Sequence, residues 1–307
     1  MSKILVFGHK NPDTDTIMSA IAMANIEKKM EETEVKPCRL GNINKETQYA
    51  LKYFDVDEPE LLEEIEKGQK VILVDHNEFS QSVKGIEDAQ IIKVVDHHKI
   101  SDFKTSEPLY FTAMPVGCTA TIIYDMYKIN NIEIDKKIAG IMLSAIISDT
   151  LLFKSPTCTP KDEQTAKELA KIAEVDINKY GLEMLKAGTD LSDFTPEQLI
   201  NIDSKTLTKD GKKYQVAQVN TVCIDDVIKN KKDIENAMEE FIKQNNEELF
   251  LLLITDILES NSQIIAIGNR KDAVEEAFNV KLENNMAFLP GVVSRKKQVV
   301  PVLEKCM

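Results

Sequence analysis

The chain has few cysteines, no long apolar run and too little positive charge to balance its carboxylates. Its five cysteines lie far apart and form no CxxC pair, which excludes a cysteine-rich zinc site and a dense disulfide framework. An odd cysteine count without a visible signal peptide is typical of reduced thiols, so a cytoplasmic protein is expected. No apolar run approaches the ~20 residues that a transmembrane helix needs.

The excess of acidic residues narrows the class of partner. With 51 acidic residues against 38 basic ones, the formal net charge is −13 at pH 7. Nucleic-acid-binding proteins normally present a basic face, so no nucleic-acid partner is expected. A small anionic substrate stays compatible with this charge, because bound metal ions can supply positive charge locally.

Short apolar runs alternate with helical segments in the first half of the chain. Runs rich in Val and Ile at residues 4–7, 71–74 and 91–95 predict strands buried on both faces. Helices are predicted at residues 16–29, 46–54, 119–128, 136–147 and 161–173. This alternation predicts an α/β fold built on a doubly wound, largely parallel sheet with helices on both faces.

A shift in composition near residues 186–190 indicates a domain boundary. We predict a first domain at residues 1–188, a linker at 189–191 and a smaller α/β domain at 192–307. In the smaller domain, antiparallel strands are expected at 201–207 and 213–219, joined by a turn at Lys209-Asp210-Gly211. A helix at 225–243 and strands at 249–255 and 263–267 follow.

All four histidines stand near aspartates, in the motifs GHKNPDTD (residues 8–15), VDHN (74–77) and VDHH (95–98). Each motif follows a predicted strand, and ligands of open α/β sheets collect at the carboxyl ends of the strands. We therefore expect these side chains to meet at one edge of the sheet. Asp149 closes the apolar stretch 141–148 and can reach the same edge from a helix end. Imidazole nitrogens and carboxylate oxygens together predict a metal site.

Two of these motifs leave their chemistry open. Asp13 and Asp15 flank Thr14 at a predicted helix start, where aspartate also serves as an N-cap without any metal. In the third motif, neighbouring side chains of an extended segment point to opposite sides, so only one of His97 and His98 is expected to bind a given ion. Asp96 shares a side with His98 and is expected to hydrogen-bond it.

The candidate ligands are too many for one small ion: His9, Asp13, Asp15, Asp75, His97 and Asp149. They suit two ions about 3.5–4 Å apart that share a bridging carboxylate. A water molecule between two such ions loses its proton near neutral pH and becomes a nucleophile. Nitrogen and oxygen ligands without a thiolate favour manganese or cobalt over a structural zinc.

A basic segment at residues 291–298 is the candidate for binding an anionic substrate. Only three of the 38 basic residues are arginines, and the planar fork of Arg295 matches phosphate oxygens. Gly291 is expected directly before a helix start, where backbone N–H groups favour anions. A solvated basic turn remains the alternative.

These motifs, in this order, resemble the DHH phosphoesterase superfamily and, within it, the manganese-dependent family II inorganic pyrophosphatases. The resemblance runs from end to end. Besides the histidine motifs it includes SDT at 148–150, SPTCT at 155–159, AQVNT at 217–221 and SRKKQ at 294–298.

The resemblance implies a DHH catalytic domain and a DHHA2-type second domain, with the active site in the cleft between them. The implied reaction is hydrolysis of magnesium pyrophosphate to two phosphates by a hydroxide that bridges two manganese ions. It also implies a homodimer formed through the N-terminal domain.

The resemblance further implies a role for each site residue. His9, Asp13 and Asp75 would hold one ion, while Asp15, Asp75, His97 and Asp149 would hold the other, with Asp75 as the bridge. His98, oriented by Asp96, would donate a proton to the leaving phosphate. Lys205, Arg295 and Lys296 would bind the far phosphate.

Three other functions share parts of this pattern. A short-chain exopolyphosphatase would have the same site with a different cleft, which the sequence does not reveal. A DHH exonuclease would lack the SRKKQ segment and fits the charge of −13 less well. A non-catalytic metal or phosphate sensor would not need both His98 and a second metal.

Overall fold

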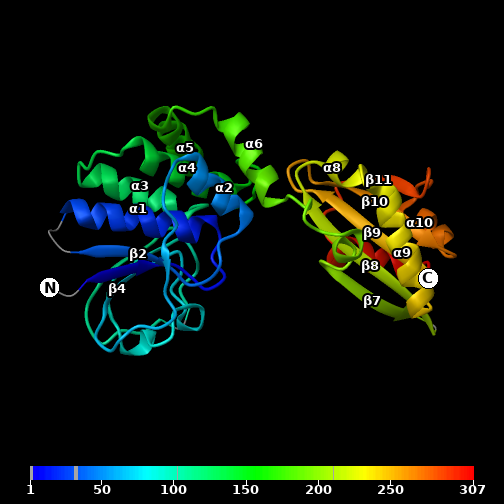
Figure 1. Ribbon diagram of the computed structural model, residues 1–307, viewed down its shortest axis with the longest axis horizontal. Coiled ribbons are helices and arrows are strands. Elements are labelled where there is room, and N and C mark those ends of the chain that lie inside the picture. The colour runs from blue at the N-terminus through cyan, green and yellow to red at the C-terminus, as the bar shows by residue number, and fades with distance from the viewer. Residues whose placement is uncertain (1–2, 31–33, 102, 210) are drawn as a thin grey trace. The chain divides into compact units, whose positions relative to one another are not determined.

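The computed structural model describes residues 3–30, 34–101, 103–209 and 211–307. The chain divides into two compact units, Met1–Gly188 and Thr189–Met307. Each unit is built around a sheet of its own (Figure 1). Across the described residues, none of the helices is both long and apolar enough to cross a membrane.

The sheet of the first unit is parallel throughout and is ordered β3-β2-β1-β4-β5-β6. Its strands are β1 Ile4–Phe7, β2 Val35–Arg39, β3 Glu60–Leu61, β4 Lys70–Val74, β5 Gln90–Asp96 and β6 Tyr110–Ala113. The strand order reverses between β1 and β4, which is the mark of a doubly wound sheet and confirms that prediction. The same reversal defines the point at which such sheets bind ligands.

The two faces of this sheet are covered differently. The helices gather on one face (Figure 1): α1 Thr14–Met30, α2 Lys45–Tyr53, α3 Thr119–Ile129, α4 Lys136–Thr150, α5 Pro160–Ala173 and α6 Ile177–Gly188. On the other face, the 3-10 turns η1 Phe79–Gln81 and η2 Ile86–Asp88 and their flanking chain bury apolar residues against the strands. Of the described residues on that face, none forms an α-helix, because the crossovers from β4 to β5 and from β5 to β6 are irregular. The prediction of helices on both faces of this sheet is therefore wrong.

Helix α4 carries Asp149 to the edge of the sheet. It starts at the N-cap Asp135, whose side chain accepts a hydrogen bond from the backbone N–H of Ile138 at 3.0 Å. It ends at Thr150, where Leu151 takes a left-handed conformation with φ 47°. Asp149 therefore lies in the last turn, which is where the sequence placed it.

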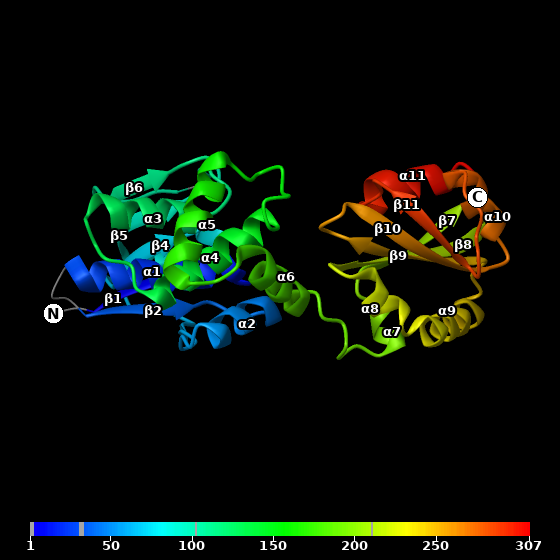
Figure 2. The same ribbon diagram turned by 90° about the horizontal axis from the view of Figure 1, so that it is seen from above.

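The sheet of the second unit is mixed and is ordered β11-β10-β9-β8-β7, with β8 and β9 parallel and the other neighbours antiparallel. Its strands are β7 Ser204–Lys209, β8 Lys212–Thr221, β9 Leu249–Asp256, β10 Asn261–Gly268 and β11 Met286–Pro290. Helices cover both faces (Figure 2), with α7 Pro196–Leu199, α8 Ile224–Ile228 and α9 Lys231–Asn245 on one, and α10 Lys271–Phe278 and α11 Val300–Leu303 on the other.

The hairpin and the helix predicted for the second unit fare differently. The antiparallel pair of strands is confirmed with shifted bounds, although Asp210 of its turn lies outside the described residues. The single helix predicted at 225–243 is wrong: it is two helices, because Asn230 leaves the helical conformation at φ −99° and ψ 16°.

The helix start expected after Gly291 is also wrong. Gly291 follows β11 with φ 70°, and its N–H donates to Asn261 Oδ1 at 2.9 Å. The helical segment begins only after Ser294, which is its N-cap. Gly291 therefore offers no helix N-terminus to an anion.

Candidate metal centre

The acidic and histidine side chains of the three motifs lie at the carboxyl ends of adjacent strands. His9 comes two residues after β1, Asp75 directly follows β4, and Asp96 is the last residue of β5. Since β1 and β4 flank the reversal of strand order, His9 and Asp75 stand at the switch point of the sheet. The expectation that these motifs share one edge is met.

Asp75 is the centre of the cluster and is only 1 % exposed. Its Oδ2 lies 3.4 Å from His9 Nε2, and its Oδ1 lies 3.4 Å from His97 Nε2. The carboxylate thus turns one oxygen to each of two histidines. That is the geometry of a carboxylate placed between two cation sites.

Asp13 combines the two roles that the sequence left open. Its Oδ1 accepts a hydrogen bond from the backbone N–H of Thr16 at 2.9 Å and so caps α1. Its Oδ2 lies 3.3 Å from His9 Nε2. Capping therefore leaves one oxygen free to act as a ligand.

Three groups of potential ligand atoms, each group within 4.8 Å, occupy the site: His9, Asp13 and Asp75; Asp15, His97 and Asp149; and Asp75, His97 and His98. His97 Nε2 lies 3.8 Å from Asp149 Oδ2 and joins the second group to Asp75. The structure therefore brings together all six residues that the sequence put forward as ligands.

The ring nitrogens of both histidines are arranged to leave Nε2 for a ligand role. His9 Nδ1 lies 2.7 Å from the carbonyl oxygen of Lys10, and His97 Nδ1 lies 3.0 Å from that of Val116. A carbonyl only accepts, so each Nδ1 carries the proton and each Nε2 faces the carboxylates.

His98 makes the hydrogen bond that was expected from Asp96. Its Nδ1 and its backbone N–H both lie 3.0 Å from Asp96 Oδ1. The prediction that His97 and His98 point to opposite sides is wrong, however, because His98 Nδ1 also lies 3.6 Å from Asp75 Oδ1. The strand ends at Asp96, so the alternation of an extended chain no longer applies to the next two residues.

The carboxylates of the cluster raise the pKa of both histidines that face them. Burial lowers the pKa of His9, but the hydrogen bonds and charges of Asp13 and Asp75 outweigh it and raise that pKa to about 11. In the same way, Asp75 and Asp15 overcome the burial of His97 and raise its pKa to about 9. Burial and the charge of Asp75 raise the pKa of Asp15 to about 6. Such a set of groups favours positive charge at its centre.

Several residues that sequence reasoning missed support these ligands. Thr16 Oγ1 donates to Asp75 Oδ2 at 2.6 Å, and Asn77 Nδ2 donates to Asp96 Oδ2 at 2.6 Å. His76 is buried, and its two ring nitrogens contact the Val74 carbonyl oxygen and Ser82 Oγ. Asn77 and His76 lie inside a motif and could have been proposed, whereas Thr16 carries no signal beyond its place near Asp15.

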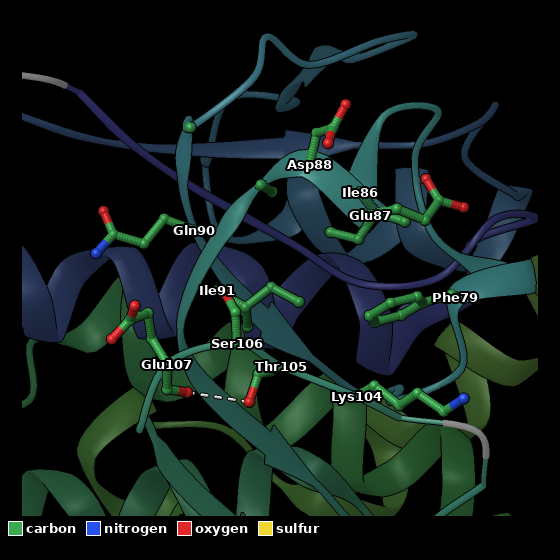
Figure 3. Close-up of a pocket in the computed structure, with 12 residues that line it drawn as sticks. Phe79, Ile86, Glu87, Asp88, Gln90, Ile91, Lys104, Thr105, Ser106 and Glu107 are labelled. Carbon is green, nitrogen blue, oxygen red and sulfur yellow. Dashed lines mark hydrogen bonds between the residues drawn. The ribbon is translucent and has the colours of Figure 1, made fainter.

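One cavity of the first unit lies at the cluster, and a larger one lies away from it. The cavity at the cluster has a volume of about 220 Å³ and is lined by His9, Asp75, His98 and Lys99 among others. The larger one, about 650 Å³, lies near the starts of β4 and β5 (Figure 3). Its lining combines Phe79 and Ile91 with carboxylates on Glu87, Asp88 and Glu107, a surface unsuited to a phosphate anion.

The three basic residues predicted to bind substrate all belong to the second unit. Arg295 Nη1 donates to the Val216 carbonyl oxygen at 3.2 Å, and Lys205 lies opposite Val216 on the neighbouring strand. Lys205 and Lys296 are exposed. Arg295 and Lys205 therefore both adjoin Val216, and Lys296 follows Arg295 in the chain.

The family of the chain follows from comparison with known proteins. Residues 3–146 match the DHH family, N-terminal domain, and residues 182–306 match the DHHA2 domain. A probable manganese-dependent inorganic pyrophosphatase of Bacillus velezensis is 60 % identical, over 99 % of this chain and 98 % of the relative. The manganese-dependent inorganic pyrophosphatase of Bacillus subtilis is 58 % identical, over 100 % and 99 %.

The chain belongs to the manganese-dependent inorganic pyrophosphatase family. A putative family II inorganic pyrophosphatase of Methanococcus jannaschii has a similar crystal structure, with a TM-score of 0.63 and 45 % identity over 99 % of both chains. An exopolyphosphatase-related protein of Bacteroides fragilis shares the fold at a TM-score of 0.53 and 15 % identity, covering 99 % of this chain and 91 % of that protein.

Proposed function

We propose that this chain is an inorganic pyrophosphatase that hydrolyses magnesium pyrophosphate to two phosphates at a centre of two manganese ions. The observation that carries the proposal is the placement of Asp75, with one oxygen towards His9 and the other towards His97. The manganese dependence and the substrate named for the relatives support the choice of metal and of reaction.

The donors present fit manganese, with cobalt as a substitute. Carboxylate oxygens and imidazole Nε2 atoms are the donors that suit these ions, and both histidines present Nε2 to the cluster. His9, Asp13 and Asp75 would hold one ion. Asp15, His97 and Asp149, with Asp75 shared, would hold the other. When bound, two such ions activate water as a nucleophile and neutralise charge on phosphate oxygens.

His98 is the proposed proton donor to the leaving phosphate. Asp96 engages its Nδ1, which leaves Nε2 available to a substrate, and the side chain is 52 % exposed. Asn77 in turn donates to the second oxygen of Asp96 and holds that carboxylate in place. A positioned imidazole of this kind contributes about 10²–10⁴-fold to a proton transfer.

The second unit is proposed to supply the positive charge that binds the far phosphate. Arg295 and Lys205 both adjoin Val216, Lys296 follows Arg295 in the chain, and the two lysines are exposed to an incoming anion. This assigns residues 1–188 to the catalytic domain, 189–191 to a linker and 192–307 to the substrate-binding domain.

A cytoplasmic homodimer formed through the N-terminal sheet completes the proposal. Strand β6 lies at an edge of that sheet, and Tyr110 at its start is 51 % exposed. An edge strand offers unpaired backbone groups to a second copy of the chain. Light scattering of the purified protein would test this, and a monomer at all concentrations would contradict it.

The function is tested by removing metal from the protein, refilling it with Mn²⁺ and measuring phosphate release from three substrates. Pyrophosphate alone should be hydrolysed, while tripolyphosphate and a short oligoribonucleotide should not. A preference for tripolyphosphate would make the protein a short-chain exopolyphosphatase. Activity on none of the three would indicate a metal or phosphate sensor.

A further inference from the structure

One short segment, residues 116–120, contacts three of the proposed metal ligands. The Val116 carbonyl oxygen accepts from His97 Nδ1 at 3.0 Å. The backbone N–H groups of Thr119 and Ala120, at the start of α3, donate to Asp15 Oδ2 and Oδ1 at 2.6 and 3.2 Å. A carboxylate at a helix N-terminus is held by these donors and by the helix dipole.

The segment also reaches the bridging carboxylate. Thr119 Oγ1 donates to Asp75 Oδ1, the oxygen that faces His97, at 3.1 Å. Asp15, Asp75 and His97 therefore take part of their orientation from the same few residues. All three would hold the proposed second ion, whereas none of the hydrogen bonds described for this segment reaches His9 or Asp13.

Asp162, in the first turn of α5, accepts hydrogen bonds from both ends of the segment at residues 117–121. It is fully buried, and its Oδ2 accepts from the Gly117 N–H at 2.8 Å while its Oδ1 accepts from Thr121 Oγ1 at 2.6 Å. The Thr159 N–H and Oγ1 also donate to Oδ2, at 2.8 and 2.6 Å. One carboxylate thus brackets residues 117–121 and ties them to the start of α5.

Four groups donate to Asp162, three of them to Oδ2 and Thr121 Oγ1 to Oδ1. Glycine is required opposite it, because a Cβ on Gly117 would lie 2.9 Å from Asp162 Oδ2 and 3.0 Å from Thr150 Cγ2. An asparagine at 162 keeps one accepting oxygen and turns its NH₂ group either to Thr121 Oγ1 or to the three donors at Oδ2, so it weakens the set of contacts.

We propose that Asp162 is a positioning residue for the metal centre, acting through residues 116–120 on Asp15, Asp75 and His97. Among the described residues, its hydrogen bonds reach none of the proposed ligands. The proposal rests on the two-metal function proposed above. It predicts a selective effect: Thr119 contacts the Asp75 oxygen that faces His97, so the ion held by Asp15, His97 and Asp149 should be affected and the ion held by His9 and Asp13 much less.

The test compares Asp162→Asn with Asp135→Asn in the full-length protein. Asp135 caps α4 in the same unit by accepting from the backbone N–H of Ile138, and asparagine can keep this bond, so this variant reports the loss of a carboxylate away from the site. Mn²⁺ binding to metal-stripped protein is measured by titration calorimetry, and the Co²⁺ visible spectrum reports ligand geometry. Asp162→Asn should melt at a lower temperature, and Asp135→Asn should melt close to the wild type.

Asp162→Asn should bind one Mn²⁺ as the wild type does and the other about 10–100-fold more weakly, the cost typical of losing such support. Its Co²⁺ spectrum should shift, and that of Asp135→Asn should not. Unchanged affinity for both ions would overturn the proposal. If Asp162→Asn does not fold, Thr121→Val removes one of its bonds, and a selective loss of several-fold is expected there.

Failure of the proposed function would look different. If the wild-type protein binds two Mn²⁺ but releases no phosphate from pyrophosphate, the proposed function is overturned. The Mn²⁺ affinities of the variants still test the role of Asp162. A wild-type protein that binds no Mn²⁺ overturns both.

Discussion

The guanidinium of Arg295 is paired with Asp203, whose Oδ1 lies 2.6 Å from Arg295 Nη2. Its Nη1 donates to the Val216 carbonyl oxygen, so two neighbouring partners fix the plane of the fork. The arginine side chain is 16 % exposed, while that of Asp203 is 57 % exposed. Residues of the second unit therefore hold the guanidinium group in one orientation. An anion that binds to it loses less side-chain conformational entropy of Arg295.

Arg295→Lys should distinguish the effect of the positive charge from the effect of the planar guanidinium group. Lysine keeps the charge but cannot hold both partners in the same plane. We expect KM for pyrophosphate to rise about tenfold, or ~1.4 kcal/mol, with little change in melting temperature because Asp203 is exposed. Asp203→Asn, which keeps an acceptor oxygen, serves as the control. A large fall in melting temperature with unchanged KM would show that Arg295 is structural.

His98→Gln should keep both metal ions and lose turnover. His98 is bound to Asp96 and is outside the proposed set of ligands, so metal content should stay at two ions per chain while kcat falls about 10²–10⁴-fold. His97→Gln is the matched variant, and it should lose metal because His97 Nε2 faces Asp75 and Asp149. Metal analysis and steady-state kinetics decide between the two residues. Loss of an ion from His98→Gln would refute its assigned role.

The sequence predicted those parts of the fold whose signal is local. Runs such as 71–74 and 91–95 contain little besides Val, Ile and Leu, and each is a central strand. Strand β2 was missed because its sequence, VKPCR, holds Pro37 between charged residues, and its pairing depends on β1. The break at Asn230 was missed because the apolar pattern of α8 and α9 continues across it.

The candidate site was predictable to the extent that its residues follow strands. Asp75 was found because it ends an apolar run in a motif. Thr119 and Asp162 were not, because their contacts span 104 residues to Asp15 and 45 residues to Gly117 and arise only from packing. The relation of His97 to His98 was misjudged because the strand ends at Asp96, two residues earlier than that argument needed.

Gly140→Ala should destabilise the first unit although alanine favours helices. Gly140 lies in α4, and a Cβ there would fall 2.3 Å from Phe54 Cδ1, far inside van der Waals contact. Overpacking of this kind costs about 1–3 kcal/mol, more than the ~1 kcal/mol gained in helix propensity. Urea unfolding of the variant measures the difference. Phe54→Leu should recover part of the loss in the double variant, and a more stable single variant would contradict the packing.

The stability of the metal-free protein should fall as the pH rises above neutral, and Mn²⁺ should reverse this trend. The pKa values of His9 and His97 are raised from 6.5 to about 11 and about 9, so the stability they contribute is complete below 6.5 and is lost as the pH rises through those values. The pKa of Asp15 is raised to about 6, so its own loss of stability is already complete near pH 6 and adds nothing to the trend above neutral pH. Mn²⁺ must displace the two imidazole protons, so it binds more tightly as the pH rises.

Melting temperatures of stripped and Mn²⁺-loaded protein, measured from about pH 6.5 to about pH 9, should therefore diverge. A stripped protein that becomes more stable over that range would show that the two histidines do not carry these protons.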